Sequence, residues 1–222
     1  MKLNLLYCDK MDDKEYWTKY YEDNSKPTDA STFAEFILPK LEENKCLIEL
    51  GCGNGRDSVY FSKNNLNVIA VDQVQCEIDY LNKNYKTDNI HFLCDDFTNL
   101  KDSKHDLIIE GNFDYIYSRF TFHAINEEKE NRTLDWIEST LSKDGIFLLE
   151  ARSVKDPMFK QGRNLSETEN FTNHYRRYMD LERIVEKLEM RNFHVEFKLE
   201  DKDLAVYKDD NPYVIRIIAR KL

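Results

Sequence analysis

One stretch of the sequence is more informative than any other: Leu47-Ile48-Glu49-Leu50-Gly51-Cys52-Gly53-Asn54-Gly55-Arg56-Asp57. Its apolar start is typical of a buried strand, and its three glycines predict a tight turn that leads into a helix. Glycine adopts positive φ without strain and lets a ligand approach the backbone, while the first turn of a helix offers unpaired N–H groups. The stretch therefore predicts a strand, a ligand-binding turn and a helix in succession.

Acidic residues near the turn favour a nucleotide-type ligand. Glu49 precedes the glycines, and Asp72 ends the next predicted strand at the spacing of a nucleotide site. The dinucleotide fingerprint Gly-x-Gly-x-x-Gly would place glycine at position 56, where this chain has Arg56. The pattern therefore disfavours a nicotinamide-dependent oxidoreductase. A turn that serves the fold alone is the other interpretation.

The remaining sequence predicts an α/β fold. Short runs that favour β-structure recur at 46–50, 68–71, 90–93, 115–117 and 146–149. Segments with helical spacing lie between most of them, at 57–63, 75–84 and 126–141. Such alternation implies right-handed crossovers and a doubly wound, mostly parallel sheet. After a helix at 181–190, runs at 193–199 and 213–219 follow without a helix between them, which predicts an antiparallel pair at the sheet edge.

Two regions outside this pattern are predicted to cover the binding edge of the sheet. Helical spacing at 12–21 and 32–42 predicts an N-terminal helical cap over residues 1–44. Residues 151–175 form the longest stretch without clear periodicity, and loops of that length are usually functional or disordered. We expect one domain over residues 1–222, with 151–175 as an insertion on the substrate side.

Composition narrows the classes of function. The chain has 32 basic and 42 acidic residues and a net charge of -10, which disfavours binding to nucleic-acid phosphates. A charged fraction of 33% disfavours a membrane protein, and the apolar stretch at the N-terminus is too short for an export signal. The five cysteines form no Cys-x-x-Cys pair and no metal-binding spacing with histidine. We therefore expect a cytoplasmic protein without a metal ion.

Residue for residue, the glycine-rich stretch resembles that of class I S-adenosylmethionine-dependent methyltransferases, and the seven predicted strands cover that family's whole Rossmann-like fold. The resemblance implies S-adenosyl-L-methionine as cofactor and S-adenosyl-L-homocysteine as product. A narrower resemblance, to small bacterial methyltransferases of capsule-polysaccharide gene clusters, rests on Tyr16-Trp17, Ser31-Thr32-Phe33-Ala34, Gly-Cys-Gly-Asn-Gly-Arg-Asp-Ser and Ser118-Arg119-Phe120.

The resemblance also implies which residues bind the cofactor. The residues of the motif that would lie along its methionyl and ribose part are Glu49, Gly51, Gly53, Asn54, Gly55 and Arg56, the last of them near the methionyl carboxylate. Asp72 would accept hydrogen bonds from both ribose hydroxyls, and Gln73 would lie beside the adenine.

Further positions complete this implied cofactor site. After the third strand, Asp96 would accept from the adenine amine and the Phe97 backbone would touch the ring, with Asp95 as the alternative acid. Ser118 follows the fourth strand, where the family lines the methionine. The N-terminal helices would add aromatic contacts from Tyr16, Trp17 and Phe33. An aromatic helix face packed on the sheet fits these last three residues equally well.

The transfer itself makes modest demands on the protein. Displacement of a methyl group from a sulfonium is in-line, so the acceptor must mainly be held in place and water excluded. A hydroxyl acceptor also needs a general base. His123, beyond the fourth strand, and Glu150, at the end of the fifth, are the candidate catalytic residues. A histidine packed at a helix start is the alternative for His123.

Basic residues gather after the fifth strand. Six basic and three acidic residues lie between Arg152 and Arg177, in a chain that is acidic overall. We expect a small anionic acceptor, such as a phosphorylated or nucleotide-linked sugar, bound by Arg119, Arg152, Arg163, His174 and Arg176. The alternative is a solvated loop whose arginines pair with neighbouring acids.

The sequence thus predicts a small-molecule O-methyltransferase. Ser118-Arg119-Phe120-Thr121 does not match the Asn-Pro-Pro-Tyr-type motif of the family's adenine and glutamine methyltransferases, which argues against those acceptors. Transfer to nitrogen of another small molecule, and a non-catalytic cofactor-binding subunit, are the alternatives. The acceptor atom and the oligomeric state stay open.

Overall fold

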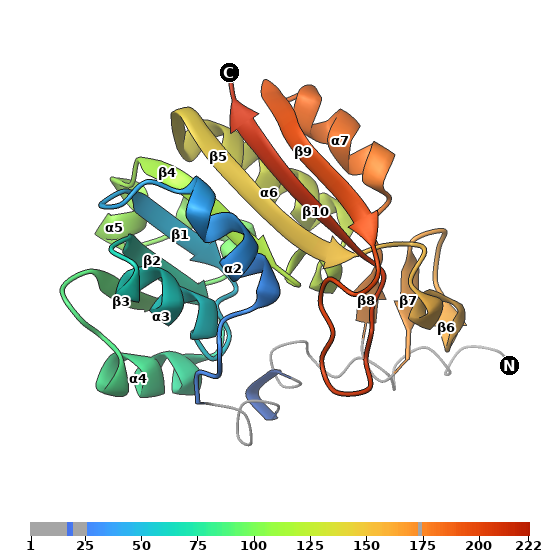
Figure 1. Cartoon of the computed structure of the whole chain (residues 1–222), viewed down its shortest axis with the longest axis horizontal. Coiled ribbons are helices and arrows are strands. Elements are labelled where there is room, and N and C mark those ends of the chain that lie inside the picture. Colours follow the sequence, from blue (N-terminus) through green and yellow to red (C-terminus); the bar gives the residue numbers. More distant parts are fainter. Residues whose placement is uncertain (1–16, 20–25, 173–174) are drawn as a thin grey trace, which may run out of the picture.

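A seven-stranded sheet forms the centre of the structure (Figure 1). The computed structural model describes residues 17–19, 26–172 and 175–222. The strands are β1 (Cys46–Leu50), β2 (Asn67–Asp72), β3 (Ile90–Cys94), β4 (Phe113–Arg119), β5 (Leu141–Arg152), β9 (Phe193–Asp201) and β10 (Val214–Lys221). In the order β3-β2-β1-β4-β5-β10-β9, the first five strands are parallel and β10 is antiparallel to both of its neighbours. The predicted fold class is confirmed.

The strand order reverses at β1, because β2 and β4 lie on its two sides. In open α/β sheets such a switch point leaves a crevice at the C-terminal ends of the strands, where ligands bind. The glycine-rich turn follows β1 and Thr121 follows β4, and a Cβ added to Gly51 would lie only 2.3 Å from the Thr121 Cγ2. The topology therefore brings these two segments together at the crevice.

Helices cover both faces of the sheet (Figure 1). On one face lie α2 (Thr32–Ile37), α3 (Arg56–Lys63) and α4 (Gln75–Asn84), and on the other α5 (Asp106–Ile109), α6 (Glu127–Thr140) and α7 (Leu181–Glu189). Successive residues of β1 point to opposite faces, so Leu47 belongs to the core under α2 and Ile48 to the core under α6. No helix in the described ranges is both long and apolar enough to cross a membrane.

Side-chain caps set where three of the helices begin. Ser31, Asn126 and Asp180 precede α2, α6 and α7, and the side chain of each accepts a hydrogen bond from a backbone N–H in the first turn. The helices predicted at 126–141 and 181–190 therefore agree with α6 and α7 to within a residue at each end.

The N-terminal region differs from the prediction. The helix expected over 32–42 ends at Ile37, and the chain continues as the 3-10 helix η1 (Leu38–Lys40). Pro39 lies within η1 and lacks the N–H group that would continue an α-helical ladder. Most of the helix expected at 12–21 lies outside the described residues, of which 17–19 are helical.

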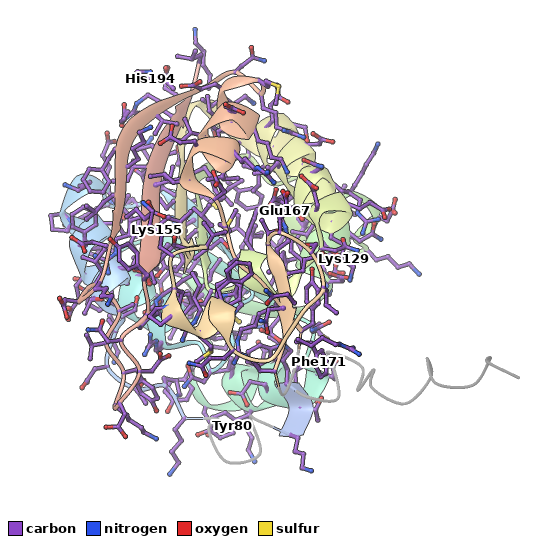
Figure 2. The ribbon with its side chains drawn as sticks, turned by 90° about the vertical axis from the view of Figure 1, so that its right-hand side faces the viewer. Tyr80, Lys129, Lys155, Glu167, Phe171 and His194 are labelled. Atoms are coloured by element: carbon purple, nitrogen blue, oxygen red, sulfur yellow. The ribbon has the colours of Figure 1, made fainter. Side chains whose placement is uncertain are left out.

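The region 151–175 is more regular than expected. After β5 come η4 (Pro157–Lys160) and a small antiparallel sheet of β6 (Arg163–Asn164), β7 (Glu169–Phe171) and β8 (Tyr175–Arg177). Strands of two or three residues are too short to display a period of two, which is why the sequence shows no periodicity there. Figure 2 shows Phe171 of β7 toward the same end of the molecule as Tyr80 of α4, and His194 of β9 at the opposite end.

Candidate cofactor and acceptor site

The glycine-rich turn is fastened to the end of β2. The Gly51 N–H donates to the Val71 carbonyl at 2.8 Å. Gly51, Gly53 and Gly55 have φ values of 73°, 53° and 72°, in the left-handed region that glycine adopts most readily. A side chain at Gly51 would also collide with Thr121. The turn is therefore a tight loop of backbone whose shape requires its glycines.

Asp72 is bonded to this turn. Its Oδ2 accepts from the Gly53 N–H and its Oδ1 from the Val74 N–H, each at 3.0 Å. Burial raises the pKa of Asp72 above its ordinary value, and backbone N–H groups, including those of Val74 and Gly53, oppose the rise. Each carboxylate oxygen has a second lone pair, so two further donors can be accepted. This chemistry fits the pair of ribose hydroxyls of a nucleoside.

The two acids after β3 differ in how their oxygens are used. The Asp95 Oδ1 accepts from the Asp96 N–H at 2.8 Å, and its Oδ2 from the Ser103 Oγ at 2.6 Å. Asp96 caps the 3-10 helix η2 (Phe97–Asp102), and its Oδ1 accepts from both the N–H and the hydroxyl of Thr98. No donor among the described residues bonds the Asp96 Oδ2. Of the two carboxylates, Asp96 therefore keeps more capacity for an adenine amine.

Two residues predicted to contact the cofactor, Glu49 and Phe33, are buried in the protein beside α3 and β4. Glu49 points to the α3 face of β1 and accepts from the Ser58 hydroxyl, and burial, with Asp57 nearby, raises its pKa well above the ordinary value. Phe33 has no exposed surface and stacks on Tyr117 with 5.3 Å between ring centroids. Protein encloses both side chains, which disfavours the cofactor contacts predicted for Glu49 and Phe33. The stacking on Tyr117 supports the packed aromatic face as the interpretation of Phe33.

Three other predicted residues lie around the turn. Arg56 is the first residue of α3, half-buried, with its Nε 3.8 Å from the Asp57 carboxylate. The Asn54 Nδ2 donates to the Lys26 carbonyl at 3.0 Å. Gln73 follows Asp72 directly, and its side chain is half-buried. All three residues lie in the turn or directly beside it or Asp72, so each can take part in the candidate cofactor site.

Of Tyr16, Trp17 and His174, the described residues include Trp17. Trp17 is half-buried within the helical residues 17–19. Tyr16 and His174 lie outside the described residues. The contacts predicted for these three residues stay predictions.

The aromatic ring of Phe120 lies after β4, at the switch-point end of the sheet. Phe120 follows β4 with a φ of 57°, a strained value for a bulky residue. The Cζ atoms of Arg119 and Arg152 lie 4.3 and 5.9 Å from its ring centroid, and the His123 ring lies 5.5 Å from it. The structure therefore gathers three predicted residues around Phe120, which sequence reasoning quoted in a motif without assigning it a role. Its position directly after a strand at the switch point was the available signal.

Ser118 is less accessible than predicted. Its side chain has no exposed surface, and its hydroxyl is hydrogen-bonded to the Thr121 hydroxyl. Thr121, not Ser118, lies directly against Gly51 of the glycine-rich turn. Ser118 therefore supports the crevice through Thr121.

Glu150 is not available as a general base. It has no exposed surface, and its two oxygens accept from the Arg119 Nε at 2.8 Å and the Arg216 Nε at 2.6 Å. Both carboxylate oxygens are therefore already engaged by buried guanidinium groups. This pairing disfavours the catalytic role predicted for Glu150, because the carboxylate holds Arg119 beside Phe120.

The predicted cluster of arginines is only partly assembled. Arg152 is buried between Asp156 and Asp210, and Arg177 is buried against Glu130. Arg163 is exposed on β6 beside the Phe171 ring, and the half-buried Arg176 donates to the Thr172 hydroxyl at 2.7 Å. The alternative of arginines paired with acids is thus correct for Arg152 and Arg177. Among the described members of the predicted set, Arg119 and Arg152 converge at Phe120.

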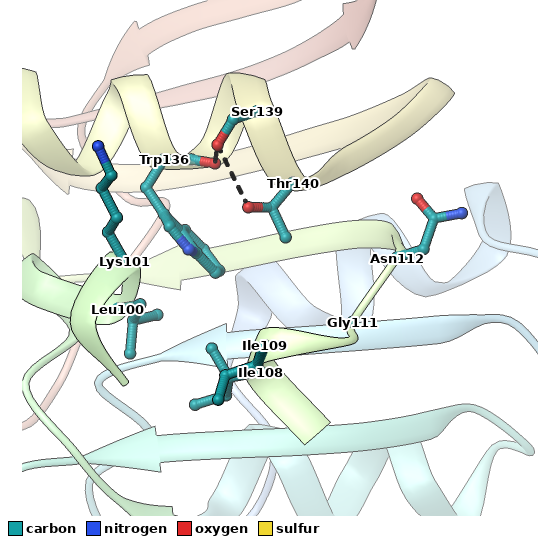
Figure 3. Close-up of a pocket in the computed structure, with 9 residues that line it drawn as sticks. All are labelled: Leu100, Lys101, Ile108, Ile109, Gly111, Asn112, Trp136, Ser139 and Thr140. Atoms are coloured by element: carbon teal, nitrogen blue, oxygen red, sulfur yellow. Dashed lines mark hydrogen bonds between the residues drawn. The ribbon is translucent and has the colours of Figure 1, made fainter. Parts of the chain in front are cut away.

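A surface hollow of about 330 Å³ lies away from this crevice, where β4 and β5 begin (Figure 3). Residues of η2, α5, α6 and the loop before β4 line it: Leu100, Lys101, Ile108, Ile109, Gly111, Asn112, Trp136, Ser139 and Thr140. The starts of the parallel strands lie at the opposite edge from the glycine-rich turn, so this hollow does not belong to the cofactor site.

The strand order, the turn and the acid at the end of β2 define a class I S-adenosylmethionine-dependent methyltransferase. The sequence profile of the methyltransferase domain family matches residues 21–196, and the chain belongs to this family. S-adenosylmethionine is its cofactor, which agrees with the hydrogen-bonding capacity of Asp72 and the backbone loop beside it.

Two curated relatives are similar in sequence. Both are described as a probable S-adenosyl-L-methionine-dependent methyltransferase TehB, from two strains of Haemophilus influenzae, and both are 29% identical to this chain, over 126 and 153 residues. The matches cover 55% and 68% of this chain but 38% and 48% of the relatives. The chain thus spans less than half the length of these relatives.

Solved structures share the fold. A 1,6-didemethyltoxoflavin-N1-methyltransferase from Burkholderia thailandensis, solved with 1,6-didemethyltoxoflavin and S-adenosylhomocysteine, gives a TM-score of 0.69 at 16% identity, covering 94% of this chain and 86% of its own. A methyltransferase from Clostridium acetobutylicum gives 0.68 at 15% identity, covering 93% and 99%. The glycopeptide N-methyltransferase MtfA, solved with S-adenosylhomocysteine, gives 0.65 at 13% identity, covering 89% and 92%.

We predict that Asp72→Ala weakens binding of S-adenosylhomocysteine about 10- to 100-fold, the cost of losing hydrogen bonds to a charged group. Calorimetric titration measures the affinity. Asp79→Ala, an exposed change on α4, is the matched control and leaves the affinity unchanged. Wild-type affinity in Asp72→Ala would contradict the ribose assignment.

We also predict that Glu77→Gln makes the fold less sensitive to rising pH. Glu77 of α4 is buried, and within the described part of the chain its Oε1 has no hydrogen-bond partner. Burial, and then the charge of Asp72, raises the pKa of Glu77 from 4.5 to about 7. Its ionised form is disfavoured only in the folded chain, so its contribution to stability is complete below pH 4.5 and is lost as the pH rises through 7.

Urea unfolding at pH 5 and pH 8 measures this effect. From pH 5 to pH 8 the wild type should lose on the order of 1 kcal/mol more than Glu77→Gln loses. Asp79→Asn, on the exposed side of the same helix, should behave as the wild type. The same pH dependence in the wild type and Glu77→Gln would show that Glu77 is not the titrating group.

Proposed function

We propose that this methyltransferase methylates an oxygen atom of a small acceptor that carries an anionic group. A phosphorylated sugar, a nucleotide-linked sugar or another capsule-polysaccharide intermediate in the cytoplasm has this chemistry. The observation that carries the proposal is the arrangement around Phe120, where Arg119 and Arg152 flank an aromatic ring at the C-terminal end of β4. An aromatic face beside two guanidinium groups suits a sugar or base ring that bears a phosphate.

The cofactor is proposed to bind across the switch point. S-adenosylmethionine supplies an electrophilic methyl group on a sulfonium. Asp72 would hold the ribose and Asp96 the adenine amine. The residues proposed to line the methionyl part and the base are Gly51, Gly53, Asn54, Gly55, Arg56, Gln73, Phe97 and Trp17. The task of these groups is to present the methyl carbon toward Phe120 and to exclude water.

His123 is proposed to take the proton from the acceptor hydroxyl. It lies in the 3-10 helix η3 (Phe122–Ala124) after β4, is 7% exposed, and packs beside Phe120. A neutral imidazole nitrogen can accept a proton from a hydroxyl placed within hydrogen-bonding distance. With Glu150 tied to two arginines, His123 is the better candidate at this edge.

The anionic group would have to share arginines that already have partners. Arg119 is paired with the fully buried Glu150, and Arg152 with the buried Asp156 and the more exposed Asp210. Asp210, with 42% of its side chain exposed, is the partner that an acceptor phosphate would displace most easily. We propose that residues 1–44 and 151–175 flank this side of a single catalytic domain.

Transfer to nitrogen is the second candidate. Phe120 would also stack on a planar heteroaromatic acceptor, and the similarly folded enzymes from Burkholderia thailandensis and MtfA are described as N-methyltransferases. A non-methylating role is a further alternative, because a protein described as the [4+2]-cyclase SpnF shares the fold with a TM-score of 0.63.

Methyl transfer from labelled S-adenosylmethionine to matched pairs of acceptors tests the proposal. Each pair contains a neutral sugar or nucleoside and its phosphorylated form, and NMR of the product identifies the methylated atom. We expect the phosphorylated form to be preferred and the product to be an O-methyl ether. Preference for the neutral form would contradict the anionic acceptor, and an N-methyl product would favour the second candidate.

We predict that His123→Ala lowers turnover about 10²- to 10⁴-fold, the usual contribution of a general base, with the affinity for S-adenosylhomocysteine preserved. In the wild type, the rate at saturating acceptor should rise with pH through one ionisation, and this limb should vanish in the variant. An unchanged rate in His123→Ala would mean that the histidine only packs against Phe120.

Phe120→Leu should raise the acceptor KM about tenfold, because leucine fills space without an aromatic face. The affinity for S-adenosylhomocysteine should stay at the wild-type value. Phe171→Leu, on the small sheet, is a control for the loss of an aromatic ring beside an arginine. Equal acceptor KM values in the wild type and Phe120→Leu would remove Phe120 from the acceptor site.

A further inference from the structure

Residues 26–31, here called the N-terminal strap, are fastened to the glycine-rich turn and the helix that follows it. At one end the Asn54 Nδ2 donates to the Lys26 carbonyl at 3.0 Å. At the other end the Ser31 N–H and hydroxyl donate to the two oxygens of Asp57, at 2.7 and 2.8 Å. The strap is thus joined to the cofactor motif from Asn54 to Asp57.

Asp57 is the centre of this attachment. It is the second residue of α3 and 3% exposed, and it accepts a third hydrogen bond from the Tyr117 hydroxyl of β4 at 2.8 Å. All three donated hydrogen bonds come from outside α3. A carboxylate in the first turn of a helix is further stabilised by the helix dipole. One buried side chain therefore joins α3, β4 and the strap.

Ser31 has a second role in the same place. Its hydroxyl oxygen accepts from the Ala34 N–H at 3.0 Å and so caps α2, which lies beside α3 (Figure 1). Two residues later, Phe33 stacks on Tyr117. Ser31 therefore fixes both the start of α2 and the end of the strap, and its bonds to Asp57 join them to the start of α3.

We infer that Ser31, Asp57 and Tyr117 are positioning residues for the cofactor. They hold the strap against the glycine-rich turn, so the turn keeps one backbone conformation before the cofactor binds. Without this attachment the strap and the turn would have to be ordered when the cofactor binds, and that entropy cost would weaken the affinity. The inference rests on the established cofactor and not on the proposed acceptor.

Calorimetric titration with S-adenosylhomocysteine tests the inference. We expect Ser31→Ala to raise the Kd about tenfold and Tyr117→Phe to raise it about threefold, although neither residue is assigned a contact with the cofactor. The double variant Ser31→Ala with Asp57→Asn should bind about as weakly as Asp57→Asn alone, because both changes break the same attachment. If Asp57→Asn does not fold, the Ser31 and Tyr117 variants carry the test.

Removing a helix cap far from the strap shows whether a change in Kd comes from lost positioning or from lower overall stability. Asp180 caps α7 by accepting from the Arg183 N–H at 3.0 Å, on the other face of the sheet. Asp180→Ala should lower Tm, as Ser31→Ala does, and leave the Kd unchanged. An unchanged Kd in both Ser31→Ala and Tyr117→Phe would overturn the inference. An equal rise of the Kd in Asp180→Ala would also overturn it, because the effect would then follow from stability alone.

Discussion

The proposed cofactor site is organised around the hydrogen bond from the Gly53 N–H to the Asp72 carboxylate. The glycine-rich turn follows β1 and the acid ends β2, so the parallel register of these two strands brings them to the same edge of the sheet. The Val74 N–H holds the second oxygen of the same carboxylate. The acid is therefore fixed in place before a ligand arrives, and little ordering remains to be done on binding.

The arginines around Phe120 are paired with carboxylates. Arg119, Glu150 and Arg216 form one buried group, and Arg152 is held by Asp156 and Asp210. Buried ion pairs gain little net stability after desolvation, but removing one partner is costly, so each pair favours a fixed position of its arginine. In the proposed acceptor site, these pairs would orient the guanidinium groups beside Phe120.

The fold and the cofactor motif could be predicted from sequence because their signals are local. Runs of apolar residues bounded by polar ones located all seven strands, and the glycines with Asp72 indicated the protein class. The errors concern long-range partners. Glu150 was predicted to be free because nothing near it in sequence shows Arg119 and Arg216, and the basic excess after β5 is neutralised in part by Glu130 and Asp210, which are distant in the chain. The attachment of Ser31 to Asp57 spans 26 residues and leaves no periodic signal.

A crystal structure with S-adenosylhomocysteine tests the central claim most directly. The account predicts that both ribose hydroxyls lie within hydrogen-bonding distance of the Asp72 carboxylate, with the methionyl part along residues 51–55 and the sulfur facing Phe120. A nucleoside bound away from Asp72, or a sulfur that faces away from Phe120, would contradict it.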